Sequence, residues 1–205
     1  MGPPMPAEYV RYGESWERHH PGWRLSLWGW PELYAMSMRN RELFDDAEQQ
    51  APHDAIRWRV DIARMEILHQ YGGIYVDCDT ECLRPLDDLL TNRMFLPESP
   101  NDPSLVTNAV MGAEPAHRFL DALIDGLPAN AAAHRGKRLV DTVGGKYITR
   151  QLAAHNPDDV AVLPWHLFAA QSIRDRDRGG IPATPHPAAY TNHVYGNTRG
   201  RRVLR

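Results

Sequence analysis

The amino-acid sequence predicts an α/β fold, in which helices cover the faces of a central sheet. Segments with the apolar spacing of helices alternate along the chain with short runs of β-branched and aromatic residues. One of the helical segments, His53–Gly73, leads through a glycine pair directly into such a run, "IYV". This alternation is typical of a layered α/β sandwich, in which ligands bind where strands end.

Length and composition favour a single folded domain. The chain has 205 residues, of which 42% are hydrophobic and 24% charged, so it is long enough for one substantial core. The net charge of -3 provides no basic surface that would collect a polynucleotide. We therefore expect one domain over residues 1–205 and no nucleic-acid partner.

The first fifty residues predict a helix, a strand and short surface helices. Aromatic residues recur at helical spacing in "AEYVRYGESWERHH", and this helix should end before Pro21. The alternating segment Gly22–Trp30 predicts a strand. The polar, helix-prone residues Pro31–Gln50 indicate short helices.

The strongest local pattern is the helix predicted within His53–Gly73. Gly72 supplies the left-handed residue that ends this helix, and a buried strand follows at Ile74–Val76. Further strands are predicted at 93–99, 105–113 and 160–164, and further helices at 115–127 and 142–155. Apolar residues form a stripe along the first helix: Ile56, Val60, Ala63, Ile67 and Tyr71, widened by Ile62 and Met65.

Two carboxylates, Asp77 and Asp79, directly follow the predicted strand. Two negative charges about 4 Å apart repel each other by about 4 kcal/mol at an effective dielectric constant near 20. A divalent cation removes this repulsion, and carboxylate oxygens suit Mg²⁺ and Mn²⁺. A solvated acidic turn is the competing interpretation, because the D-x-D pattern alone is common.

The preceding helix adds a second charged pair to this region. Asp61 and Arg64 are three residues apart and share a helix face, so they are expected to form an ion pair or to point together into the crevice. Apolar residues occupy much of the same helix, so at least one of the two residues is expected at the edge of the core beside the strand, where charged groups are often functional.

The remaining features concern the compartment. The two cysteines, Cys78 and Cys82, are too few and too close for a secreted disulfide framework, so reduced thiols are expected, and the sequence does not place the partners of a four-ligand zinc site. No apolar run reaches the roughly 18 residues of a membrane span, and the start of the chain has no signal-peptide core. The sequence thus predicts a cytoplasmic protein.

The segment "RVDIARMEILHQYGGIYVDCDTECLRPLDDLL", Arg59–Leu90, resembles the signature of glycosyltransferase family 32, whose sugar-binding region contains a DXD motif. This family includes yeast-type mannosyltransferases and is similar in its core to the glucosylating clostridial toxins. The segments 5–28 and 107–124 resemble neighbouring blocks of the family. The resemblance implies a GT-A type nucleotide-diphospho-sugar transferase fold, with a mixed central sheet flanked by helices.

The resemblance also implies a function and roles for particular residues. The function is retaining, metal-dependent transfer of a sugar from a nucleotide-diphosphate donor to a carbohydrate, lipid-linked or other hydroxyl acceptor, which leaves peripheral membrane contact open. Asp77 would contact the ribose or the metal, and Asp79 would bind Mn²⁺ or Mg²⁺ at the pyrophosphate, so both are candidate catalytic residues. Asp61 and Arg64 would hold hydroxyls of the donor sugar, and Tyr75 would support the nucleotide or sugar.

Two departures from the family pattern affect this implication. The first strand, which usually reads I-P-x-x-I-H-x-x-W, is missing, so we expect either a misassigned start or a natural truncation with a damaged base pocket. The C-terminal block, a histidine followed by serine and tryptophan, is represented by His193 and Asn197 without the tryptophan. These two residues are candidates for support of the pyrophosphate or metal, and a surface strand end is an equally good interpretation.

Two alternative functions stay open at this point. The missing strand favours an inactive sugar-nucleotide-binding module. A haloacid-dehalogenase-like phosphatase also carries D-x-D after an apolar strand, with Asp77 as the nucleophile and Asp79 as the acid/base. That motif normally continues with threonine or valine where this chain has Glu81.

Overall fold

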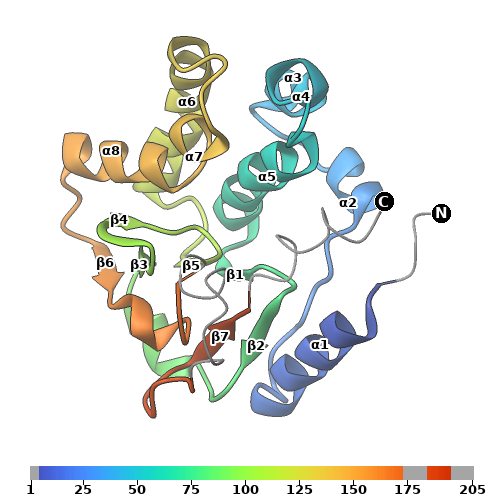
Figure 1. Cartoon of the computed structure of the whole chain (residues 1–205), viewed down its shortest axis with the longest axis vertical. Coiled ribbons are helices and arrows are strands. Elements are labelled where there is room, and N and C mark those ends of the chain that lie inside the picture. The colour runs from blue at the N-terminus through green and yellow to red at the C-terminus, as the bar shows by residue number, and fades with distance from the viewer. Residues whose placement is uncertain (1–4, 173–183, 195–205) are drawn as a thin grey trace.

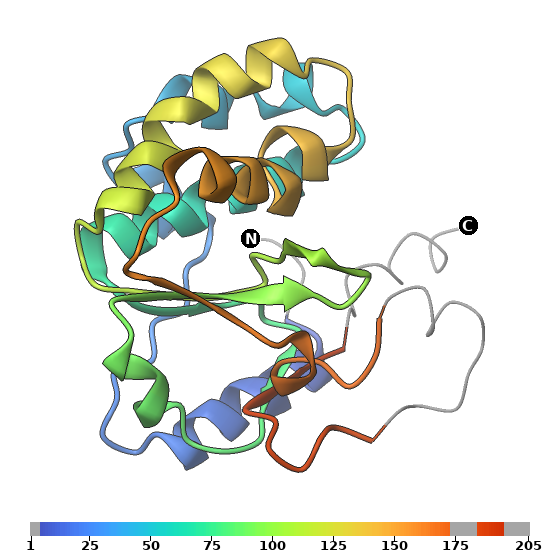
Figure 2. The same ribbon diagram turned by 90° about the vertical axis from the view of Figure 1, so that its left-hand side faces the viewer.

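The structure is a computed structural model that describes residues 5–172 and 184–194. Three layers are visible (Figure 1, Figure 2): a layer of helices, a central mixed sheet, and a third layer that contains the N-terminal helix and a two-stranded sheet. The helices are α1 Ala7–His19, α2 Trp30–Ala35, α3 Arg41–Asp45, α4 Ala47–Gln50, α5 Ala55–Tyr71, α6 Arg118–Ala133, α7 Leu139–Thr142 and α8 Gly145–His155, with 3₁₀ helices η1 Asp87–Thr91 and η2 Trp165–Leu167.

The central sheet has five strands, and their pairing makes it mixed. Its strands are β1 Gly73–Val76, β3 Met94–Ser99, β4 Asp102–Val106, β5 Val110–Ala113 and β6 Val160–Leu163. The order is β1-β5-β3-β4, and β6 pairs parallel with β3 while the other pairs are antiparallel. A second sheet joins β2 Thr80–Cys82 to β7 Thr191–His193. The expected α/β class with a mixed central sheet flanked by helices is confirmed.

The passage from α5 into β1 sets the position of the acidic motif. Gly72 ends the helix at φ 65°, and a Cβ atom there would lie 2.6 Å from the Cδ atom of Pro115, so only glycine fits. Val76 at the end of β1 pairs with Val110 of β5, and the Asp77 N–H then bonds the Ala109 carbonyl at 2.8 Å. The chain therefore delivers Asp77 at the end of a short central-sheet strand, as the sequence predicts. The expected burial of this strand is wrong, because β1 lies at the edge of the described sheet and its residues are exposed or half-buried.

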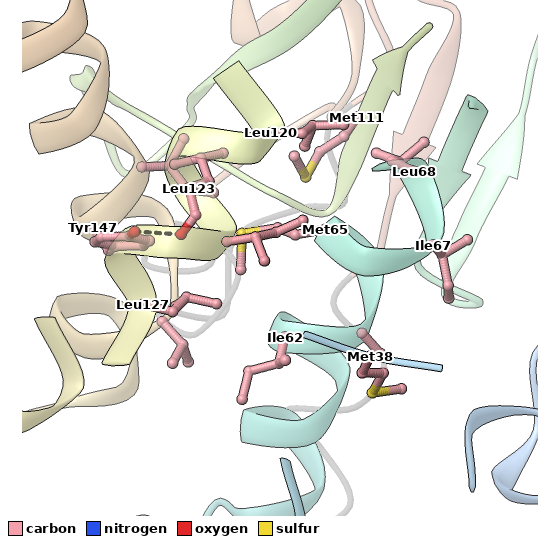
Figure 3. Close-up of a cluster of buried hydrophobic side chains, with 14 of the residues drawn as sticks. Met38, Ile62, Met65, Ile67, Leu68, Met111, Leu120, Leu123, Leu127 and Tyr147 are labelled. Carbon is pink, nitrogen blue, oxygen red and sulfur yellow. Dashed lines mark hydrogen bonds between the residues drawn. The ribbon is translucent and has the colours of Figure 1, made fainter. Parts of the chain in front are cut away.

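The main core lies between the sheet and helices α2 to α8. Figure 3 shows its centre, where Leu120, Leu123 and Leu127 of α6 face Met65 of α5. The Tyr147 hydroxyl donates a hydrogen bond to the Leu123 carbonyl at 2.5 Å, which ties α8 to α6. Each fully buried large apolar side chain contributes about 1.5 to 3 kcal/mol, so this layer holds α5 rigidly above the sheet.

A smaller core lies on the other face of the sheet. Trp16 of α1 packs there with Phe95, Val110, Phe168 and Tyr190. Ile74 and Val76 pack against this cluster, whereas Tyr75 between them packs against the main core, as the alternation of a strand requires.

Three predictions about local structure are wrong in part. The segment Gly22–Trp30 forms no strand, because none of the described strands pairs with it: residues 22–29 are extended or turned, and Trp30 already begins α2. The strand expected at 105–113 is divided into the end of β4 and β5 by a loop at Thr107 to Ala109. The ends of the predicted α5 stripe, Ile56 and Tyr71, are 64% and 61% exposed, because the central part of this helix is buried on most of its circumference and the stripe follows only one face.

Two further expectations concern the sheet edge and the membrane. Within the described residues no strand precedes β1, which pairs on one side only, with β5. None of the helices in the described parts of the chain combines the length and the apolar character that a membrane span requires.

Candidate active site

A buried arginine lies between two carboxylates where α5 meets the end of β1. The Nη2 atom of Arg64 lies 3.0 Å from Oδ1 of Asp61 and 3.2 Å from Oδ1 of Asp77. Asp61 is 6% exposed and Arg64 is 4% exposed. The pair expected on one helix face is therefore formed, and it reaches forward to the acidic motif.

Two more side chains complete this network. The Tyr75 hydroxyl donates to Oδ1 of Asp77 at 3.0 Å, and the Arg64 guanidinium lies 4.8 Å from the centroid of the Tyr75 ring. The side-chain amide of Asn108 donates to Oδ1 of Asp61 at 2.9 Å, while its backbone carbonyl accepts from Nη1 of Arg64. Asn108 had no role in the sequence prediction, although it lies in the segment 107–124 whose resemblance was noted.

Burial and neighbouring charges together set the pKa values of this network. Burial raises the pKa of Asp61 to about 6, with a further increase from the charge of Asp77, although Arg64 and Asn108 act in the opposite direction. Burial alone would lower the pKa of Arg64, but the charges of Asp77, Tyr75 and Asp61 outweigh it and raise that pKa above its ordinary value. Burial likewise raises the pKa of Tyr75, which keeps its hydroxyl protonated as a donor. The Arg64 guanidinium therefore stays positively charged beside the carboxyl groups of Asp61 and Asp77.

A second cluster joins the acidic motif to the far end of the chain. Asp77, Asp79 and His193 each offer one ligand atom, and these atoms all lie within 4.8 Å of one another. The Nε2 atom of His193 lies 3.1 Å from Oδ1 of Asp79. Strands β2 and β7 lie side by side (Figure 1). Their pairing sets this contact, because Thr80 is in register with His193.

The cluster fits a divalent cation in chemistry and in size. Two carboxylates suit Mg²⁺ and Mn²⁺, and an imidazole is a common additional ligand of transition metals. Opposite ligands of such an ion are about 4.2 Å apart, twice a metal–oxygen distance of about 2.1 Å. The three ligand atoms, all within 4.8 Å of one another, are therefore close enough to share one such ion.

The N-terminal helix holds the turn that carries Asp79. The Trp16 indole donates to the Thr80 carbonyl at 2.9 Å, and the Ser15 hydroxyl accepts from the Cys82 N–H at 2.9 Å. Burial, followed by the charges of Asp79 and Cys78, raises the pKa of Tyr9 to about 12. A protonated phenol from α1 therefore stands in the electric field of the acidic motif, a contribution that the sequence reasoning missed.

The structure brings six of the seven predicted site residues together and does not describe the seventh. Asp61, Arg64, Tyr75, Asp77, Asp79 and His193 form the two connected clusters described above. Asn197 lies outside the described residues. Both cysteines are free: Cys78 is exposed and Cys82 is buried, and burial raises the pKa of Cys82 to about 11.

Residues 6–96 match the protein family described as "Glycosyltransferase sugar-binding region containing DXD motif". Inositol phosphoceramide mannosyltransferase 1 of Schizosaccharomyces pombe is 31% identical over 176 residues, which are 80% of this chain and 53% of the relative. Inositol phosphoceramide mannosyltransferase 2 of the same yeast is 37% identical over 136 residues, 66% of this chain and 32% of the relative. These matches confirm the resemblance that the sequence motifs indicate.

The matched regions cover only part of each relative. The chain spans about half the length of the first of these mannosyltransferases and about a third of the second. A solved structure titled PaToxG Glycosyltransferase aligns with a TM-score of 0.44 at 17% identity over 55% of this chain and 40% of that chain, a similarity too low to support a conclusion.

Proposed function

We propose that this protein transfers a sugar from a nucleotide-diphosphate donor to a hydroxyl acceptor, with retention of the anomeric configuration and with Mn²⁺ or Mg²⁺ as cofactor. The match of residues 6–96 to the sugar-binding region of the DXD-containing glycosyltransferases supports this proposal. The observation that carries the proposal is the cluster of Asp77, Asp79 and His193 beside the buried Arg64–Asp61 pair. In this proposal, the cation site and the sugar-binding site would lie side by side there.

In the proposed reaction, Asp77, Asp79 and His193 would hold the cation next to the donor diphosphate. A bound divalent cation would stabilise the negative charge that develops on the departing nucleoside diphosphate. Asp79 is almost fully buried. Its charge would attract a bound cation more strongly there than in bulk water, because the effective dielectric constant is lower. Asn197 is a further candidate for this support.

The donor sugar is assigned to the other half of the site. Asp61 accepts and Arg64 donates hydrogen bonds to sugar hydroxyls, and Tyr75 packs below Arg64 to keep the guanidinium in place. Their burial makes these polar contacts strong and geometrically fixed, because the surrounding protein holds each side chain in one orientation.

Transfer forms a bond between the acceptor oxygen and the anomeric carbon and breaks the bond from that carbon to the diphosphate oxygen. For retention, the acceptor attacks from the face that the diphosphate leaves, and its hydroxyl proton passes to the departing diphosphate. The two relatives are named as inositol phosphoceramide mannosyltransferases. We therefore include mannose among the candidate sugars, and a lipid-linked or carbohydrate hydroxyl as the acceptor.

The two alternative functions make different predictions. An inactive module binds the nucleotide sugar without releasing a nucleoside diphosphate. A phosphatase releases phosphate from phosphate monoesters and ignores nucleotide sugars. The similarity to mannosyltransferases favours transfer over both alternatives.

A panel of nucleotide sugars, tested with Mn²⁺ and with a chelator, separates the three functions. The expected result is a Mn²⁺-dependent rise in melting temperature with one nucleotide sugar, together with slow release of its nucleoside diphosphate. Binding without release would support the inactive module. The absence of both binding and release with every donor would refute the proposed function.

A further inference from the structure

A hollow beside the cation cluster is not used by the proposed donor site. It lies where the end of β3, the β4–β5 loop, η2 and β7 meet. His193 lines this hollow and is also a member of the cation cluster, so the two sites are adjacent. The other residues that matter here are Glu98, Thr107, Val110, Trp165 and Phe168.

The lining of the hollow is mainly apolar, with one carboxylate at a defined position. Oε2 of Glu98 accepts a hydrogen bond from the backbone N–H of Trp165 at 3.3 Å, and this bond holds the Glu98 side chain against η2. No hydrogen bond reaches Oε1 of Glu98 from the described residues. Apolar walls with a few convergent polar groups are typical of small-molecule sites.

The shape of the hollow limits what it can accept. Its empty volume is about 240 Å³, open solvent included, but its enclosed part has room for about one water molecule. A hydroxyl group is close to a water molecule in size. A ring that carries hydroxyls would therefore place one of them inside and rest its C–H face on the half-buried Trp165.

We propose that this hollow is the acceptor subsite, which takes a polyol ring, either a sugar or an inositol, with one hydroxyl hydrogen-bonded to Glu98 and the ring against Trp165. The role of this subsite in catalysis rests on the proposed function, the transfer of a sugar to a hydroxyl acceptor. Glu98 acts here as a binding residue: it orients the acceptor so that a different hydroxyl of the ring reaches the anomeric carbon, and the bonds formed and broken are those of the transfer given above.

The hollow lies next to His193, and this position favours a role in binding the acceptor over a role as a second binding site for the donor. The donor sugar is assigned to Asp61 and Arg64, which Asn108 holds from the β4–β5 loop. Thr107 and Ala109, on either side of Asn108, line the hollow. One loop thus separates the two sites, so that a donor and an acceptor held in them would meet at the cation cluster.

The test compares wild-type protein with Glu98→Gln and Trp165→Ala. Glu98→Gln keeps an oxygen for the Trp165 N–H, so the fold is expected to be retained. Matched controls are Glu42→Gln, an exposed carboxylate of α3, and Trp30→Ala, a 39% exposed indole of α2. Saturation-transfer NMR measures binding of myo-inositol and methyl α-mannoside directly, and enzyme kinetics measure transfer to the same compounds and donor hydrolysis without an acceptor.

The expected result is that both site variants weaken polyol binding about tenfold and raise the acceptor KM by a similar factor. Glu98→Gln loses a hydrogen bond to a charged group, and Trp165→Ala loses the apolar surface on which the ring rests. Donor KM, donor hydrolysis and both controls should be unchanged. Equal polyol binding by wild-type protein and the site variants, or no binding by wild-type protein, would overturn the acceptor subsite. If wild-type protein binds no donor, the proposed function is refuted instead. Saturation-transfer NMR would still decide whether the hollow binds a polyol.

Discussion

His193 lies 3.1 Å from Asp79 although the two residues are 114 positions apart in the sequence. The pairing of β2 with β7 makes this contact, and it adds an imidazole to the two carboxylates of the acidic motif. The cation cluster is therefore completed only when the C-terminal part of the chain folds back onto the motif.

His193→Ala is expected to weaken Mn²⁺ binding by about 10- to 100-fold, because removal of one ligand or of its hydrogen-bonded partner has effects of this size at metal sites. Isothermal titration calorimetry measures the affinity. The matched control is His155→Ala, at the exposed end of α8, which should leave it unchanged. Equal Mn²⁺ affinity in His193→Ala and wild-type protein would remove His193 from the site.

Asp79→Asn is expected to abolish the increase in melting temperature that Mn²⁺ causes and to lower transfer by about 10²- to 10³-fold, the typical effect of losing one stabilising group for a developing charge. The side chain keeps its shape, so the melting temperature without metal should change little. Asp158→Asn, an exposed carboxylate, is the control. Undiminished metal-dependent turnover in Asp79→Asn contradicts the proposed role.

Arg64→Met is expected to lower the free energy of unfolding by about 3 to 5 kcal/mol, because it leaves Asp61 and Asp77 without the buried cation between them. Urea unfolding measures the change. A second substitution, Asp61→Asn in the same protein, should recover part of the loss. Arg57→Met removes an exposed ion pair with Asp54 and should cost less than about 1 kcal/mol. A stable Arg64→Met protein would show that the network does not depend on this charge.

The pKa of Asp61 predicts a pH-dependent difference in stability between wild-type protein and Asp61→Asn. Burial raises this pKa from 3.8 to about 6, so folding favours the protonated acid. Its contribution to stability is complete below about pH 4 and is lost as the pH rises through about 6. Relative to Asp61→Asn, wild-type protein should lose about 3 kcal/mol over this range. Urea unfolding of both proteins between pH 4 and pH 7 checks this, and a pH-independent difference would contradict it.

Trp16→Phe is expected to weaken Mn²⁺ binding a few-fold, because it removes the hydrogen bond that holds the Thr80 carbonyl beside Asp79. Its cost in unfolding free energy is about 1 to 3 kcal/mol. Trp58→Phe removes a matching indole bond, to the Leu43 carbonyl at 2.9 Å, in the main core. This control should show a similar loss of stability with unchanged Mn²⁺ affinity. Equal Mn²⁺ affinity in Trp16→Phe and wild-type protein would limit α1 to a structural role.

The local pattern of the chain was sufficient to predict α5, the stop at Gly72 and the strand that delivers Asp77. Helical spacing, a positive φ that glycine tolerates and a short β-branched run are all properties of neighbouring residues. The same reasoning predicted that Asp61 and Arg64 share a helix face, because residues three apart on a helix are neighbours. Motif resemblance over a longer stretch then indicated the family and added Tyr75 and His193 as candidates.

Only the tertiary structure decided which distant groups meet. The reach of Arg64 to Asp77, the role of Asn108, the hold of Trp16 on the acidic turn and the pairing of β7 with β2 all join segments that no local pattern connects. Gly22–Trp30 alternates like a strand, but none of the strands in the described parts of the chain pairs with it, and a strand exists only through hydrogen bonds to another strand. Helices satisfy their hydrogen bonds locally and can be predicted from the sequence, whereas sheets and sites depend on contacts that the whole fold selects.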